Sequence, residues 1–474
     1  MDYELVVIGS GPAGESAAVM ASIFGRRTEV VERDKPGGTV TTTGGAPTKT
    51  LREAAMYLTG FRDRATYGIS IAAPPEVVLP TIAERARQVC ELLQRVVAQN
   101  LAQRQVAYLQ GSARLGPNRT VQVTGPDGAV ESLSADVILL ATGSHPLRPS
   151  AIPFDDPDVC DTDQIFKLGR IPKELFIVGC GAVGVEFATI FAALGARVTL
   201  SDKMNRLLPM MDAELSQLMA ESFAQMGVEI LLGVGTESVE RVNGALRVTL
   251  SDGSHLTPDV LLFAAGRRAN TQNLGADVAG IQLDRHGHVI VDNDYRTSAD
   301  GIYAAGDVVR PSLASIAMEQ GRLAMFRAFN LPFRDALHPV PVSAVYGLPE
   351  VAGAGMTEEQ CRDQEIAYEV GRCDLAITPR GAIVGHGGLL KLIFRRDDRR
   401  LLGVHAICDV ASELVGMGQA VISSGEAIDV FAALTLNTPT YTYAYKYATF
   451  DGLLRLADSW GGPRALAAMA ESAL

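Results

Sequence analysis

Apolar and polar positions near the start of the chain predict a strand, a helix and a second strand. The apolar run Leu5–Ile8 is rich in β-branched residues and leads into a glycine-rich turn, as a buried strand does. Small and apolar residues follow, and we expect a helix over residues 15–24. After a further glycine, a second strand is expected over Thr28–Val31, ending at Glu32.

The same arrangement recurs in the middle of the chain. An apolar run over residues 175–178 precedes a second glycine-rich turn, and the strand after the next helix ends at Asp202. Asp202 follows Gly179 by 23 positions, which is also the separation between Gly9 and Glu32. Two copies in the same register predict an internal repeat of a strand–helix–strand unit.

Each turn has the pattern Gly-x-Gly-x-x-Gly, formed by Gly9, Gly11 and Gly14 in the first copy and by Gly179, Gly181 and Gly184 in the second. In a dinucleotide site the first glycine makes the tight turn, the second admits a pyrophosphate, and the third lets the helix pack on the strand. The phosphates lie at the helix N-terminus, and the later acid binds the ribose hydroxyls. Glycine turns without a ligand are the weaker interpretation, because both copies keep the acid. The sequence predicts one flavin and one nicotinamide dinucleotide, with hydride passing between them.

Composition and charge limit the possible partners. A chain of 474 residues is long enough for about three domains. Its net charge of −12 argues against binding to nucleic acid or to an anionic membrane surface. Neither a signal peptide nor an uncharged apolar run of about 18 residues is visible, so we expect a cytoplasmic protein that does not span a membrane.

The six cysteines are isolated from one another in sequence. None forms a Cys-x-x-Cys or Cys-x4-Cys pair, and we find no cluster with metal-ligand spacing. We therefore expect buried or surface thiols in a reducing compartment, and no metal site.

Further motifs resemble a known family. Residues 136–144, 264–270 and 301–307 resemble the crossings between domains and the second FAD motif of the flavoprotein disulfide reductase superfamily with two dinucleotide domains. The resemblance runs from Asp2 to about Leu456. Within the superfamily the chain is most similar to the soluble, FAD-dependent pyridine nucleotide transhydrogenases. Residues 48–54, 315–324, 366–371 and 437–440 carry that likeness.

The resemblance implies an α/β fold with two Rossmann-like dinucleotide-binding domains and a C-terminal α/β dimerisation domain. We expect the FAD-binding domain at residues 1–146 and 268–336, the NAD(P)-binding domain at 147–267, and the interface domain at 337–474. The interface domain is expected to form a homodimer.

It also implies the residues at each site. For FAD we expect Gly9, Gly11, Pro12, Ala13, Gly14, Glu32, Arg33, Gly38, Thr39, Lys49, Ala141, Thr142, Gly143, Gly306, Asp307, Ala314, Ser315 and Ala317. For NAD(P) we expect Gly179, Gly181, Val183, Gly184, Glu186, Asp202, Lys203, Gly266 and Arg267. Lys49 and Glu186 are expected to form an ion pair near flavin N5, as the catalytic pair.

The sequence departs from the disulfide-reducing pattern at two places. The two positions that hold the redox cysteines in such relatives are Val40 and Gly45, neither of which can form a thiolate. The His and Glu of the relatives' proton-relay dyad are replaced by Thr438 and Tyr443. We therefore expect an FAD-dependent NAD(P)H oxidoreductase that works without a redox disulfide.

The electron acceptor stays open between three hypotheses. The first is a second nicotinamide nucleotide, which makes the protein a transhydrogenase. The second is a quinone, another organic acceptor or dioxygen, for which Val40 and Gly45 would leave space beside the flavin. The third is a flavin-bearing redox sensor or partner-binding subunit. Asp202 favours NAD(H), while Lys203 and Arg206 could attract a 2′-phosphate and keep NADP(H) as a candidate.

Overall fold

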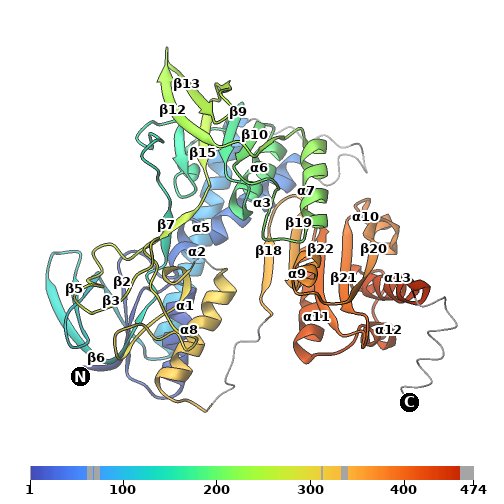
Figure 1. Cartoon of the computed structure of the whole chain (residues 1–474). Coiled ribbons are helices and arrows are strands. Elements are labelled where there is room, and N and C mark those ends of the chain that lie inside the picture. The colour runs from blue at the N-terminus through green and yellow to red at the C-terminus, as the bar shows by residue number, and fades with distance from the viewer. Residues whose placement is uncertain (1, 61–67, 69–74, 311–312, 333–339, 460–474) are drawn as a thin grey trace.

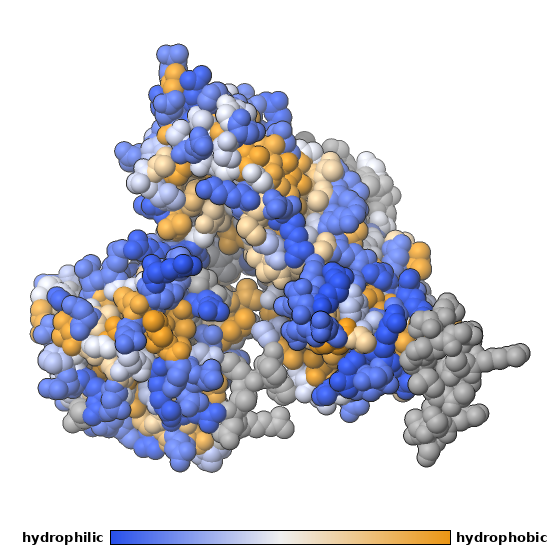
Figure 2. Space-filling model, viewed as in Figure 1, coloured by the Kyte–Doolittle hydropathy of each residue, from blue (hydrophilic) through white to orange (hydrophobic). Residues whose placement is uncertain are grey.

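The computed structural model describes residues 2–60, 68, 75–310, 313–332 and 340–459. Figure 1 shows three groups of elements: a sheet with helices near the N-terminus, a second sheet above it, and an orange-to-red C-terminal sheet beside both. Within the described residues, none of the helices is both long and apolar enough to cross a bilayer. Figure 2 shows a face dominated by hydrophilic residues, with apolar residues scattered among them.

The first sheet contains the first glycine motif. Its parallel strands lie in the order β3 (Ala107–Gln110), β2 (Thr28–Glu32), β1 (Tyr3–Ile8), β6 (Val130–Leu140) and β17 (Ile302–Ala304). Strands β5 (Thr120–Thr124) and β4 (Ser112–Leu115) extend it in antiparallel fashion. In β1, Leu5, Val6 and Val7 are fully buried, because a parallel sheet is covered on both faces.

Two helices cover one face of this sheet. Helix α1 (Pro12–Ile23) connects β1 to β2 and packs along α8 (Ala314–Ala328), as Figure 1 shows. A Cβ on Gly321 would lie 2.1 Å from the Ala13 carbonyl oxygen, so this close approach requires glycine. Helices α2 (Gly38–Thr42), α3 (Gly45–Thr59) and α5 (Pro75–Gln103) follow β2.

The second sheet repeats the plan of the first. Its five parallel strands lie in the order β11 (Glu229–Leu232), β10 (Arg197–Asp202), β9 (Glu174–Val178), β15 (Val260–Phe263) and β8 (Val159–Asp161). Helix α6 (Ala182–Ala193) connects β9 to β10, as α1 connects β1 to β2. Helix α7 (Ala213–Met226) and the antiparallel strands β12 (Thr236–Val242), β13 (Ala245–Leu250) and β14 (His255–Leu256) complete this part.

Two short antiparallel strands join the first and second sheets. Strand β7 (Ser144–Pro146) leaves the first sheet and β16 (Arg267–Ala269) returns to it, with Arg268 paired to His145. The expected domain boundaries at 146/147 and 267/268 fall at these strands. The expected boundary at 336/337 lies outside the described residues.

The C-terminal part is built on an antiparallel sheet. Its order is β18 (Val342–Val345), β19 (Glu350–Gly355), β22 (Leu401–Cys408), β21 (Leu389–Arg395) and β20 (Tyr368–Asp374). Helix α11 (Ala411–Ser424) packs on β19 and β22, and α13 (Ala444–Ser459) packs on β20 and β21. Short helices α9 (Glu358–Asp363), α10 (Pro379–Val384) and α12 (Asp429–Ala433) complete it. The predicted fold class is confirmed.

Candidate active site

One cleft brings the first glycine motif together with segments from all three sheets. It has a volume of about 1240 Å³. The expected FAD residues that line it are Gly9, Gly11, Pro12, Ala13, Glu32, Arg33, Gly38, Thr39, Lys49, Ala141, Thr142, Gly143, Gly306, Asp307, Ala314, Ser315 and Ala317. Gly14 is buried behind the turn. Val342, Ala344, Tyr346 and Ser412 of the C-terminal part also line this cleft.

The three glycines of the first motif have distinct structural roles. Gly9 has a φ of +104°, and a Cβ there would lie 2.3 Å from the Ala141 carbonyl oxygen. A Cβ on Gly14 would lie 1.9 Å from the Gly9 carbonyl oxygen, so helix and strand approach too closely for a side chain. A Cβ on Gly11 would have Gly38 Cα, 3.9 Å away, as its nearest neighbour among the described atoms. The middle glycine thus leaves the space that a pyrophosphate needs.

Two helices direct their N-termini at the cleft. Gly11 caps α1 and Leu313 caps α8, and neither of these described residues makes a side-chain capping hydrogen bond. Helix N-termini attract negative charge through their unpaired N–H groups and the helix dipole. Because Gly11, Pro12, Leu313 and Ala314 all line the cleft, both ends can stabilise a bound anionic group.

The acid at the end of β2 is held against the glycine turn. Glu32 Oε2 accepts hydrogen bonds from the backbone N–H and the hydroxyl of Ser10, both at 2.8 Å. Glu32 Oε1 accepts a hydrogen bond from the Asp34 N–H at 2.9 Å. These bonds orient the carboxylate at the edge of the cleft, where it can accept from a ribose.

The expected ribityl-binding aspartate connects to the strands between the sheets. Ser144 Oγ donates to Asp307 Oδ2 at 2.7 Å, and Arg267 Nε donates to Ser144 Oγ at 2.7 Å. Arg267 Nε lies 3.9 Å from Asp307 Oδ2. Hydrogen bonds therefore connect Ser144 and Asp307, from the two expected FAD segments, with Arg267, which follows the second sheet.

Lys49 and Glu186 form an ion pair across the cleft. Lys49 Nζ lies 2.8 Å from Glu186 Oε2 and 3.0 Å from Oε1. The side chain of Glu186 is 7% exposed and that of Lys49 is 35% exposed. The backbone N–H of Tyr346 also donates to Glu186 at 2.9 Å, and Lys49 Nζ lies 4.7 Å from the centre of the Tyr346 ring. Lys49 thus presents a positive charge to the cleft from a fixed position.

The second glycine motif reproduces the geometry of the first. Gly179 has a φ of +119°, and its Cβ would lie 2.7 Å from the Ala264 carbonyl oxygen; on Gly184 a Cβ would lie 1.8 Å from the Gly179 oxygen. Asp202 accepts hydrogen bonds from the N–H groups of Cys180 at 2.7 Å and Met204 at 2.9 Å. The contact between Cys180 and Asp202 corresponds to that between Ser10 and Glu32.

The expected NAD(P) residues divide into two groups. Val183, Glu186 and Arg267 line the cleft described above. The others lie outside its lining: Gly179, Gly181, Gly184, Asp202, Lys203 and Gly266. This division fits a nucleotide whose reactive end enters the cleft while its adenosine end stays on the second sheet.

Val40 and Gly45, the positions where the resemblance predicts the redox cysteines of relatives, lie in contact. A Cβ on Gly45 would lie 3.0 Å from Val40 Cγ1 and 3.2 Å from Val40 Cα, and both residues line the cleft. All six cysteines lie within the described residues, are buried and form no disulfide with one another. Burial raises the pKa of the Cys160, Cys180 and Cys373 thiols to about 12, that of Cys361 to about 11, and also that of Cys90.

Sequence reasoning missed several residues of the cleft, among them Tyr346 and Asp163. Tyr346 reaches Lys49 and Glu186 from the C-terminal part, and Asp163 lines the cleft beside Arg267 NH1, 4.0 Å away. Burial raises the pKa of Asp163, while the neighbouring Arg267 partly opposes that effect. The sequence contains no local signal for these contacts, because both depend on packing between distant segments.

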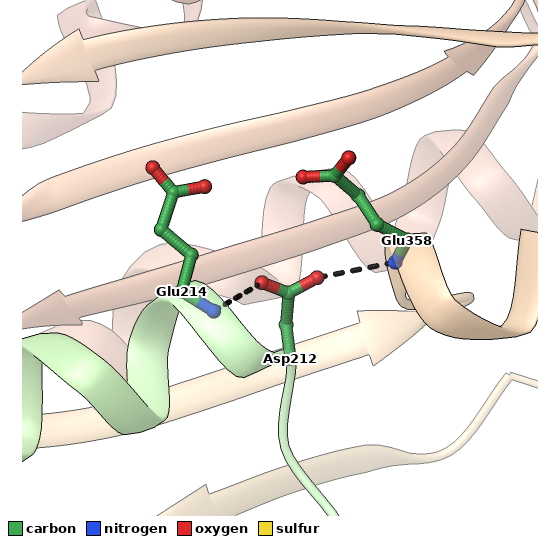
Figure 3. Close-up of side chains that lie close together, drawn as sticks. All are labelled: Asp212, Glu214 and Glu358. Carbon is green, nitrogen blue, oxygen red and sulfur yellow. Dashed lines mark hydrogen bonds between the residues drawn. The ribbon is translucent and has the colours of Figure 1, made fainter.

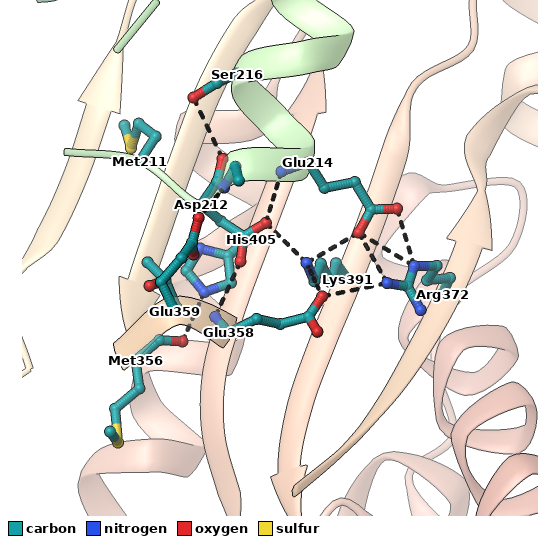
Figure 4. A network of polar contacts seen from close by, with 12 residues as sticks. Met211, Asp212, Glu214, Ser216, Met356, Glu358, Glu359, Arg372, Lys391 and His405 are labelled. Carbon is teal, nitrogen blue, oxygen red and sulfur yellow. Dashed lines mark hydrogen bonds and ion pairs between the residues drawn. The ribbon is translucent and has the colours of Figure 1, made fainter. Parts of the chain in front are cut away.

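An acidic cluster lies where the second sheet meets the C-terminal sheet. Asp212, Glu214 and Glu358 direct their carboxylates toward a common point (Figure 3). Figure 4 shows that Lys391 occupies this point: its Nζ lies 2.7 Å from Asp212, 2.9 Å from Glu214 and 2.5 Å from Glu358. Arg372 pairs with Glu214 from the other side. Lys391 therefore stands where a cation would bind.

Comparison with known proteins matches nearly the whole chain. The family model described as pyridine nucleotide-disulphide oxidoreductase matches residues 3–321, and that of the family's dimerisation domain matches residues 341–449. The chain is 35% identical over 454 residues to a soluble pyridine nucleotide transhydrogenase of Mycobacterium tuberculosis, covering 95% of this chain and 97% of the relative. It is 37% identical over 471 residues to one of Pseudomonas aeruginosa, covering 96% and 99%.

Solved structures show the same fold. LpdA from Mycobacterium tuberculosis superposes with a TM-score of 0.87 at 28% identity, covering 94% of this chain and 99% of that chain. The HOCl-induced flavoprotein disulfide reductase RclA from Escherichia coli gives a TM-score of 0.84 at 26% identity, with coverage of 94% and 99%.

Proposed function

Because this chain belongs to the pyridine nucleotide-disulphide oxidoreductase family and is an FAD-dependent pyridine nucleotide oxidoreductase, we propose that it works as a transhydrogenase without a redox disulfide. The observation that carries the proposal is the contact between Val40 and Gly45 in the cleft. A thiol relay would need sulfur atoms at this contact, and the chain has a methyl group and a hydrogen atom there. The dimerisation domain supports the expected homodimer.

The cleft fits FAD through the features already described. The space beside Gly11, the two helix N-termini and the oriented Glu32 carboxylate match a pyrophosphate and a ribose. When bound, FAD supplies a centre that takes a hydride from a reduced nicotinamide and returns one to an acceptor. In this proposal, Gly9, Gly11 and the start of α1 bind its phosphates, and Asp307 binds the ribityl chain.

Lys49 and Glu186 act as an electrostatic pair in this proposal. Lys49 supplies a positive charge that stabilises negative charge developing on the reduced cofactor. Glu186 fixes that charge, because its carboxylate accepts from both Lys49 and the Tyr346 N–H. The two residues come from α3 and α6, so the pair also joins the two dinucleotide-binding parts.

A nicotinamide nucleotide is the acceptor that these residues favour. The relatives named transhydrogenases cover nearly the whole chain. The space that a quinone would need beside Val40 and Gly45 is restricted, because the Val40 methyl group lies over Gly45. A nicotinamide acceptor needs no new space, since the oxidised nucleotide leaves and a second one takes its position.

The test is anaerobic reduction of the bound flavin by NADH, followed by mixing with single oxidants. We expect rapid reoxidation by a thionicotinamide analogue of NAD or NADP, ping-pong kinetics, and competition between excess NADH and the acceptor. Rapid reoxidation by a quinone but not by the analogue would overturn the transhydrogenase assignment. Slow reoxidation by every acceptor would support the partner-binding subunit instead.

A further inference from the structure

We propose that Glu359, in the C-terminal part, determines how the second glycine motif discriminates between a 2′-hydroxyl and a 2′-phosphate. It does so by neutralising Arg206, four residues beyond Asp202. This inference rests on the proposed binding of a nicotinamide nucleotide at that motif. The interface domain thus contributes a specificity-determining residue to a site on another domain.

Arg206 belongs to the nucleotide site by its backbone. Its carbonyl oxygen accepts from Cys180 Sγ at 3.2 Å, and the N–H of Leu208 donates to the Cys180 carbonyl at 2.9 Å. Cys180 lies between two glycines of the motif and also binds Asp202. The loop that carries Arg206 therefore lies against the turn on which the nucleotide would bind.

The side chain of Arg206 is held by other groups. Its NH1 donates to Glu359 Oε1 at 2.7 Å, and its NH2 donates to the carbonyls of Pro209 at 2.9 Å and Met211 at 3.1 Å. Glu359 Oε1 also accepts from the Ala213 N–H at 3.1 Å, at the first residue of α7. Glu359 thus neutralises the charge of the guanidinium and helps to fix its direction. Figure 4 shows Glu359 beside the Lys391 network.

Two opposing charges would otherwise act on the 2′ position. Asp202 favours a hydroxyl and repels a phosphate. A free Arg206 would attract the phosphate, because guanidinium groups bind phosphate oxygens through charge-assisted hydrogen bonds. With Arg206 paired to Glu359, the repulsion by Asp202 prevails and the site prefers NAD(H).

The experiment measures dissociation constants of 2′,5′-ADP and 5′-ADP by calorimetry for the full-length holoenzyme. Glu359→Gln should raise the affinity for 2′,5′-ADP relative to 5′-ADP by about 10-fold, since the charge on Arg206 becomes uncompensated. Arg206→Gln alone should leave this ratio unchanged, and the double variant should cancel the gain. Glu365→Gln, which changes an exposed glutamate after the same helix, is the matched control.

Two results would overturn the inference. One is an unchanged ratio in Glu359→Gln. The other is a drop in 2′,5′-ADP affinity in Arg206→Gln alone, which would show that the arginine already binds the phosphate; this variant decides the matter even where Glu359→Gln does not fold. Failure of the unsubstituted protein to bind either nucleotide would overturn the proposed function together with this inference.

Discussion

Val40 and Gly45, where the resemblance predicts the cysteine pair of disulfide-reducing relatives, lie in contact: a Cβ on Gly45 would lie 3.0 Å from Val40 Cγ1. The same Cβ would lie 3.2 Å from Val40 Cα, and since the two Cβ atoms of a disulfide are typically about 3.8 Å apart, the two backbones are close enough for one. The pair is therefore the place to test the proposed disulfide-free mechanism.

Placing cysteines at both Val40 and Gly45 should raise the number of electrons that the protein accepts per FAD. We expect the unsubstituted protein to take two electrons per FAD in an anaerobic dithionite titration, about as many as the flavin alone accepts. Val40→Cys/Gly45→Cys should form a disulfide and raise that capacity to about four electrons per FAD. The single variant Val40→Cys is the control. A capacity of four in the unsubstituted protein would contradict the disulfide-free mechanism.

Lys49 should control the rate of flavin reduction. Lys49→Met removes the positive charge from the cleft, so we expect hydride transfer from NADH to slow by about 100-fold, with FAD still bound. Stopped-flow absorbance of the flavin measures this rate. Lys167→Met, at an exposed lysine, should have no effect. An unchanged rate in Lys49→Met would show that Lys49 is not catalytic and that its ion pair with Glu186 is only structural.

The sequence predicted more of the fold than of the cleft. Both strand–helix–strand units and their glycine turns follow from local patterns, because turn geometry and helix starts depend on neighbouring residues. The contacts of Tyr346 with Glu186 and of Glu359 with Arg206 join residues more than 150 positions apart. No periodicity marks such contacts, since they depend on how domains pack.

Asp202 should set the nucleotide preference. Asp202→Ala removes the charge that repels a 2′-phosphate, so the ratio of kcat/KM for NADPH to that for NADH should rise by at least about 10-fold. Steady-state kinetics with a thionicotinamide analogue of NAD as the electron acceptor measure the ratio. Asp277→Ala, an exposed position, is the control. If the ratio stays constant, Asp202 does not face the ribose.

The ion pair of Glu359 should give a pH-dependent stability. Partial burial raises the pKa of Glu359, but the hydrogen bonds that its carboxylate accepts from Arg206, from its own backbone N–H and from Thr357, together with the charge of Arg206, lower the pKa to about 2, below the ordinary 4.5. A lowered pKa stabilises the fold above about pH 4.5, and this contribution is lost as the pH falls toward 2. The difference in Tm between the unsubstituted protein and Glu359→Gln should therefore narrow below pH 4.5. A difference that is constant from pH 7 to 3.5 would contradict the assignment.

Lys391 should be replaceable by a metal ion. Its side chain is 1% exposed and compensates the buried Asp212 and the partly buried Glu214 and Glu358, so Lys391→Ala leaves three carboxylates facing one another without a cation. Removing one partner from a buried ion network costs about 3–5 kcal/mol, and Tm should fall accordingly. Three carboxylates within reach of one point are ligands that Ca²⁺ accepts, so millimolar Ca²⁺ should restore part of the lost Tm in Lys391→Ala. Calcium should leave the unsubstituted protein and the exposed-site variant Lys173→Ala unchanged, because Lys391 already fills the position in both. Equal stability of Lys391→Ala and the unsubstituted protein would show that the three carboxylates do not need a cation between them.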